Sequence, residues 1–155
     1  MPKSDIERDF PSLAGVAYDL SDEDFNYNCL AYALGDQKNW WEPPKGAGHY
    51  WPPGFSDDTS VKTVESIIRT HGFTVEVTDK KVNPETDAIA IYAEGTVWTH
   101  FAKFSSGLWS SKLGEGHDVE GIVLEHLEGP FYGTVAKILR RPKRKQVKER
   151  GASDS

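Results

Sequence analysis

A chain of 155 residues is long enough for one domain with its own hydrophobic core and too short for two domains of average size. Hydrophobic residues make up 37% of it, and the longest apolar run, residues 88–93, is far shorter than the ~18 residues that a membrane span needs. The single cysteine, Cys29, excludes a disulfide framework and a zinc site built from several thiolates. Together with an N-terminus too charged for a signal peptide, this favours a reducing, cytoplasmic location.

The net charge of −6 is distributed unevenly along the chain. Residues 140–150 carry a net charge of +6, so the remainder carries −12. An acidic body does not suit a nucleic-acid groove, and only the basic segment 141–155 is suited to phosphate or to an acidic partner. The chain therefore divides into an N-terminal arm (1–20), a single domain (21–140) and a basic tail that we predict to be disordered, with no membrane partner expected.

The first part of the domain predicts a short helix followed by a long loop. Asn26 or Asn28 can cap a helix over residues 29–34, because an asparagine side chain accepts a hydrogen bond from a free backbone N–H of the first turn. Residues 36–58 are rich in proline, glycine and aromatic side chains, which excludes a regular helix or an interior strand. Long ordered loops of this kind are often functional.

The second part predicts one amphipathic helix and then an antiparallel meander. Apolar residues fall at helical spacing between residues 59 and 70, and Asp58 or Thr59 can cap this helix. A loop is expected over residues 114–129. Strands are predicted at residues 73–77, 88–93, 96–104, 108–112 and 132–139. This order predicts an α+β fold, in which a short Cys-bearing helix and one amphipathic helix pack on an antiparallel β-sheet.

Cys29 is the first residue of the predicted short helix. The free backbone N–H groups of a first turn favour a thiolate and can also donate hydrogen bonds to an oxyanion. The alternative is that Cys29 is a small buried apolar residue, since free cysteines are commonly buried. The chemistry therefore depends on whether a base lies beside it.

A thiol nucleophile needs a base, which is usually histidine. His100 lies within an apolar strand beside Trp98, where a rigidly held imidazole is suited to general-base chemistry. The alternative is a core histidine whose hydrogen bonds are satisfied. The other four histidines are expected in loops or at an element's end: His49, His71, His117 and His126.

A third group is needed to fix the tautomer of the base. If Ser105 and Ser106 form the turn of the hairpin, Ser111 lies opposite His100, whereas a slip of one residue places Lys112 there. Asp118, in the loop that follows, is a further candidate. The alternative for each is an ordinary polar residue at the surface.

Aromatic side chains gather in the long loop, at Trp40, Trp41, Tyr50 and Trp51. With Trp109 from the hairpin, they can form one wall of a cleft for a peptide or a sugar. The alternative is that they cover the core. No glycine pattern for a phosphate or dinucleotide is present, and no histidine pair suggests a metal, so no cofactor or metal is implied.

The order of these parts resembles the papain-like cysteine hydrolases, especially the small bacterial cell-wall peptidases and amidases. Cys29 at a helix start is followed by an apolar strand (84–92), by a strand that carries His100 and by a polar strand (108–112), so that the resemblance spans residues 26–112. It implies that Cys29 is the nucleophile and His100 the base. Two features depart from the clan. Ser111 or Lys112 stands where an amide or imidazole normally orients the base, and Asn26, Asn28 or the Cys29 N–H must replace the usual oxyanion glutamine.

A finer pattern is similar to that of a group of uncharacterised domains of the same layout. Their motifs resemble residues 28–33 (Asn-Cys-Leu-Ala-Tyr-Ala), 109–114 (Trp-Ser-Ser-Lys-Leu-Gly), 118–119 and 127–133. This resemblance covers nearly the whole chain and implies no particular substrate.

The resulting prediction is a cysteine hydrolase that cleaves an amide or peptide bond through a thioester. Acyl transfer to an amine would use the same groups. The predicted catalytic residues are Cys29, His100, Ser111 and Asp118, and the predicted substrate-binding residues are Asn28, Trp41, Tyr50, Trp51 and Trp109. The alternative function is a catalytically inert binding module whose aromatic loop holds a peptide or glycan.

Overall fold

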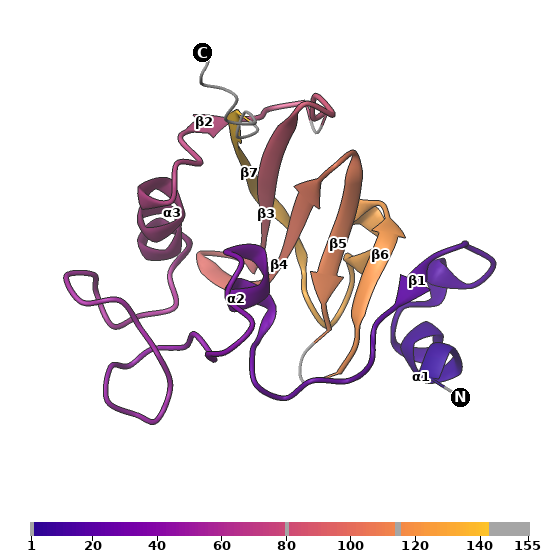
Figure 1. The fold of residues 1–155 in the computed structure, drawn as a ribbon, viewed down its shortest axis with the longest axis horizontal. Helices are drawn as coiled ribbons and strands as arrows, with labels where there is room; N and C mark the ends of the chain where they lie inside the picture. Colours follow the sequence, from indigo (N-terminus) through magenta and orange to yellow (C-terminus); the bar gives the residue numbers. More distant parts are fainter. Residues whose placement is uncertain (1, 80, 114–115, 143–155) are drawn as a thin grey trace, which may run out of the picture.

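The computed structural model describes residues 2–79, 81–113 and 116–142, and it has an α+β fold built on one seven-stranded antiparallel sheet (Figure 1). The strands are β1 (Asp19–Leu20), β2 (Val75–Glu76), β3 (Thr86–Glu94), β4 (Val97–Ser105), β5 (Leu108–Lys112), β6 (Asp118–Ile122) and β7 (Thr134–Pro142). The helices are α1 (Pro2–Asp9), α2 (Cys29–Ala33) and α3 (Val61–Thr70), with 3-10 turns η1 (Pro11–Leu13) and η2 (Leu124–Leu127). The α+β class predicted from the sequence is thereby confirmed.

The sheet has the strand order β1-β6-β5-β4-β3-β7-β2, so β3 to β6 form a meander and β7 returns along the other side of β3. β3 lies between two long neighbours and is covered on both faces, which explains its unbroken apolar run. Ala88 to Ala93 are each at most 5% exposed. No helix in the described part of the chain is long and apolar enough to cross a membrane.

Two hydrophobic cores cover the two faces of this sheet. On one face, α2 and α3 pack Leu30 and Ile67 against Ile91 of β3. In Figure 1 α2 lies in front of the sheet, over β4, and α3 lies to the left of the strands. On the other face, Phe10 and Leu13 from the N-terminal segment pack with the alternate residues of the same strands. Residues 1–20 were predicted to be an N-terminal arm, and the described ones form α1, η1 and β1 and contribute to the second core.

The β4–β5 hairpin turns at Ser106 and Gly107, both of which have positive φ (53° and 82°). This is the backbone of a two-residue type I′ turn, which favours glycine at its second position. The predicted turn at Ser105 and Ser106 is therefore wrong by one residue, and the strand register moves by two. Phe104 pairs with Trp109, and the hydrogen-bonded ladder ends at Lys103 and Ser110.

β4 contains a bulge where it meets β3. Tyr92 pairs with His100 and Ala93 pairs with Trp98, so Thr99 is an extra residue on β4. The bulge places Trp98 on the same face as Phe101, three residues later, and their ring centroids lie 5.1 Å apart. Bulges of this kind redirect side chains and occur next to active sites.

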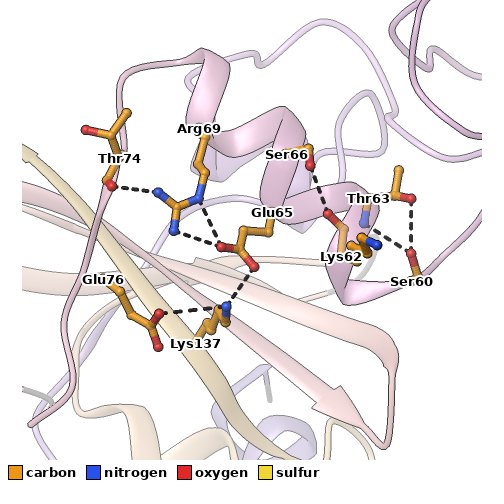
Figure 2. A network of polar contacts seen from close by, with 9 residues as sticks. All are labelled: Ser60, Lys62, Thr63, Glu65, Ser66, Arg69, Thr74, Glu76 and Lys137. Atoms are coloured by element: carbon orange, nitrogen blue, oxygen red, sulfur yellow. Dashed lines mark hydrogen bonds and ion pairs between the residues drawn. The ribbon is translucent and has the colours of Figure 1, made fainter.

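Helix α3 is held against β7 by a network of charged side chains (Figure 2). Glu65 accepts hydrogen bonds from Arg69 (2.9 Å) on the same helix and from Lys137 (2.8 Å) on β7. The helix begins one or two residues later than predicted, because Ser60 is the N-cap and accepts from the Thr63 N–H. Asp58 instead accepts hydrogen bonds from the backbone and hydroxyl of Ser60.

The C-terminal part departs from the sequence prediction in two places. The loop expected at residues 114–129 contains β6 and η2. Val119 and Ile122 of β6 are buried, although their neighbours in the sequence are charged residues and Gly121. β7 continues to Pro142, so the first residues of the predicted basic tail belong to the sheet. The rest of that tail, residues 143–155, lies outside the described residues.

Candidate functional site

A pocket of about 290 Å³ opens where the N-terminus of α2 meets the first residues of β4. Cys29 and His100, which are 71 positions apart in the chain, both line it. The remaining lining residues come from the long loop, β4 and the segment before β7: Asn28, Trp40, Glu42, Thr59, Trp98, Thr99 and Tyr132. The fold therefore brings the predicted nucleophile and base to one cavity.

Asn28 sets the position of Cys29 by capping α2. Its Oδ1 accepts hydrogen bonds from the Ala31 N–H (3.1 Å) and from the Trp41 N–H (3.2 Å), and its Nδ2 donates to the Trp41 carbonyl oxygen (2.7 Å). The side chain is 5% exposed. Its polar atoms join the helix to the long loop, and because Asn28 also lines the pocket, its role in substrate binding stays a prediction.

The Cys29 side chain is surrounded by protein. It is 8% exposed, and burial raises the pKa of its thiol to about 12. Backbone N–H groups of Phe101, Leu30 and Cys29 itself act against this shift, whereas the negative charge of Glu42 adds to it. Burial is the largest of these effects, so the thiol is neutral at pH 7 in the unliganded protein.

His100 is 1% exposed, and burial lowers the pKa of its imidazole to about 3. Its ring stacks on the ring of Tyr132, with centroids 3.7 Å apart and planes 3° from parallel. A fully buried imidazole favours the neutral form because the low dielectric of the interior penalises the cation. His100 is therefore an uncharged imidazole held in one orientation.

Ser111 determines which nitrogen of His100 is free. Its Oγ lies 2.5 Å from His100 Nε2 and donates its own hydrogen to the Phe101 carbonyl oxygen (2.7 Å). Because the single hydroxyl hydrogen is used in that way, Ser111 accepts the hydrogen bond from Nε2–H, and the lone pair of His100 lies on Nδ1. The contact between Ser111 and His100 lies beyond the last paired residues of β4 and β5, so the predicted strand register does not explain it.

Tyr132 lies within the motif at residues 127–133, and no role was predicted for it. It lines the pocket, stacks on His100, and its backbone oxygen accepts a hydrogen bond from the Thr99 hydroxyl. Burial, followed by the nearby Cys29 sulfur, raises the pKa of its phenol. A tyrosine flanked by Gly129 and Gly133 was the available signal, since such glycines often mark a close approach of backbone segments.

Asp118 on β6 and Lys112 on β5 lie in a different cluster, against the segment that precedes Cys29. Asp118 accepts a hydrogen bond from the Tyr27 hydroxyl (2.9 Å) and, among the described residues, none from His100. Lys112 is fully buried, and its ammonium donates to the carbonyl oxygens of Asp24 (2.5 Å) and Gly116 and lies over the Tyr27 ring. The structure therefore does not bring Asp118 to the base.

Of the aromatic residues predicted to form the cleft wall, Trp40 lines the pocket, whereas the others lie elsewhere. Trp41 (7% exposed) and Trp51 (3%) belong to the core beneath α2 and α3, and Tyr50 packs edge-on against Trp41. Trp109 packs in the core on the opposite face of the sheet. Trp98 lines the pocket together with Trp40. Aromatic content identified the correct loop, but neighbouring tryptophans in it point in different directions.

The fold and the site define an α+β protein with a pocket lined by a buried cysteine and a buried, oriented histidine. A family model described as a domain of unknown function (DUF7689) matches residues 18–140, which is most of the chain, and the protein therefore belongs to the DUF7689 family. Comparison with the curated proteins and with the solved structures gives no match. Within the described residues, no group of three or more histidine, cysteine or acidic side chains is arranged to hold a metal ion.

Proposed function

We propose that this protein is a cysteine hydrolase of amide or peptide bonds, related in its arrangement to the papain-like enzymes. The observation that carries the proposal is that Cys29 and His100 line one pocket while Ser111 fixes the tautomer of His100. A nucleophile and a base that share a pocket, with a group that orients the base, are the components that nucleophilic catalysis needs.

In the proposed reaction, Nδ1 of His100 accepts the proton of the Cys29 thiol as the sulfur attacks the carbonyl carbon of the substrate. The backbone N–H of Cys29 stabilises the oxyanion that forms. The C–N bond then breaks, the leaving amine takes the proton from the imidazolium, and a thioester remains on Cys29. Water attacks the thioester with His100 as base, the carboxylic acid leaves, and the sulfur regains a proton.

The burial of both groups determines when the proton moves. The pKa of Cys29 is raised to about 12 and that of His100 is lowered to about 3, so both are neutral before substrate binds. Proton transfer therefore accompanies attack on the substrate instead of preceding it, in contrast to a site with a preformed thiolate–imidazolium pair.

Ser111 acts in this scheme as a positioning residue. Its hydroxyl holds Nε2–H of His100 and is itself held by the Phe101 carbonyl oxygen, so the imidazole keeps Nδ1 available. A serine hydroxyl does not supply the negative charge that an aspartate would, and it stabilises the imidazolium less. The base is oriented but remains a weak one.

The pH dependence of Cys29 alkylation by iodoacetamide tests the pair, since the chain has no other cysteine. We expect His100→Ala to lower the rate at pH 7 by at least about tenfold, and Ser111→Ala to lower it less. His126→Ala is the matched control, because His126 lies in η2 and not in the pocket. His100→Gln, which retains a side-chain amide, serves if the alanine variant does not fold.

Equal rates and pH profiles in the wild type and both His100 variants would contradict the proposal. The inert binding module predicts that outcome, together with ligand binding that survives Cys29→Ala. In that case the ligand would contact Trp40 and Trp98, since Trp51 is in the core.

A further inference from the structure

The pocket that holds Cys29 carries one formal charge. Among the described residues that line it, Glu42 is the single carboxylate, and no lysine or arginine is present. Glu42 is exposed and forms no ion pair with another described residue. Glu42 lines the same pocket as Cys29, and its charge is the smallest of the effects that act on the pKa of the Cys29 thiol. A positively charged group bound in this pocket would therefore meet a carboxylate that forms no ion pair with another described residue.

The position of this carboxylate is fixed by the loop around it. Glu42 Oε1 accepts a hydrogen bond from Trp40 Nε1 (2.9 Å). The Glu42 N–H donates to the Tyr50 carbonyl oxygen (2.9 Å), and the Tyr50 N–H donates to that of Trp40 (2.8 Å). The paired backbone segments hold Glu42 and Trp40 together at the pocket, so that one supplies a negative charge and the other the face of an indole ring.

Aromatic faces complete the surroundings. Trp40 and Trp98 line the same cavity, and indole rings attract ammonium and guanidinium groups through their negative faces. The body of the chain outside residues 140–150 carries −12, so the long-range field also favours the approach of a cation. A carboxylate, aromatic walls and an acidic body all select the same sign of ligand charge.

We propose that Glu42 is a specificity determinant, and that the acyl substrate of Cys29 carries an ammonium or guanidinium group next to the scissile amide. The acyl part of this statement rests on the proposed hydrolase function. The preference of the pocket for a cation does not, because it concerns binding beside Cys29 whatever the fate of the sulfur. The two can therefore be tested in one experiment with separate readouts.

The probes are three methanethiosulfonates that differ in charge: the aminoethyl, methyl and sulfonatoethyl reagents. Each transfers its thioalkyl group to the Cys29 sulfur as a mixed disulfide and releases methanesulfinate, while the thiol proton goes to a base. The measured quantity is the ratio of the cationic to the anionic rate, each normalised to the neutral reagent. This ratio cancels the change in thiol pKa that a Glu42 substitution causes.

We expect the wild type to favour the cation and Glu42→Gln to lower the ratio by at least about fivefold at low salt, as removal of one unit charge a few ångströms from the probe implies. High salt should reduce the wild-type preference. Glu85→Gln is the matched control, because it removes the same charge from the turn before β3, at the opposite end of that strand from Tyr92 and its partner His100. Glutamine keeps an oxygen that can accept from Trp40, so the loop should stay folded, which thermal unfolding will verify.

A ratio that is the same in the wild type and in Glu42→Gln would overturn this inference, even if His100→Ala slows the neutral reagent as the hydrolase proposal requires. A ratio that falls in Glu42→Gln would support it, even if the neutral rate proves independent of His100 and the hydrolase proposal fails. If Cys29 reacts with none of the three reagents, the pocket is closed to ligands and both proposals fail.

Discussion

Acid should destabilise this protein through His100, because the folded chain holds that imidazole in its neutral form. Burial lowers its pKa to about 3, whereas an unfolded histidine has a pKa near 6.5. Between these values the unfolded state binds a proton that the folded state does not, so the free energy of unfolding falls as the pH falls. The loss due to this one group is about 2 kcal/mol between pH 7 and pH 5, and its slope approaches about 1.4 kcal/mol per pH unit.

The assay is urea unfolding of the wild type and of His100→Gln at a series of pH values. Subtracting the variant removes the contributions of the carboxyl groups and of His71, whose pKa is also lowered, by burial and by the charge of Arg141. We expect the difference to move by about 2 kcal/mol over this range in the direction that favours the variant at low pH. A constant difference would refute the reasoning, as would an NMR titration of the His100 ring with a midpoint near 6.5.

Two further predictions concern the elements that support the site. Gly133→Ala should lower the free energy of unfolding by about 3 kcal/mol, because a Cβ at this positive-φ position (72°) would overlap the Ala93 carbonyl oxygen; a change below about 1 kcal/mol in chemical denaturation would contradict this. Glu65→Gln should cost about 1 kcal/mol, since it weakens the bridge from α3 to Lys137, and the loss should shrink in high salt; a salt-independent loss would show that packing, not charge, is responsible.

Local signals in the sequence were sufficient for the two halves of the site. The asparagine cap before an apolar stretch predicted that Cys29 begins a helix, and the apolar residues around His100 predicted its strand. Both signals act over a few residues, and both elements formed within one or two residues of the predicted bounds. The sequence also placed Ser111 on the neighbouring strand, where its hydroxyl lies beside His100.

The remaining features depend on contacts between distant segments, which local patterns do not encode. The hairpin register depends on which two residues of the turn take positive φ, and these are Ser106 and Gly107. Trp40 and Trp41 are adjacent and chemically alike, yet one lines the pocket and the other fills the core, because the paired loop segments orient them oppositely. The N-terminal segment has no periodicity of its own and is ordered by the sheet face on which it packs.

The bulge in β4 also indicates which residue of the sheet could be inserted or deleted without changing the strand pairing. If Thr99 were absent, β4 would be regular at this point: Trp98 would directly precede His100 and would still lie on the same face as Phe101. The strand pairing therefore does not require Thr99. What Thr99 adds is the hydroxyl that binds the backbone of Tyr132, the residue whose ring stacks on His100. In terms of insertions and deletions, Thr99 is an extra residue of the sheet, and we expect a chain that lacks it to keep the architecture but to lose the hydroxyl that helps to hold Tyr132 beside His100.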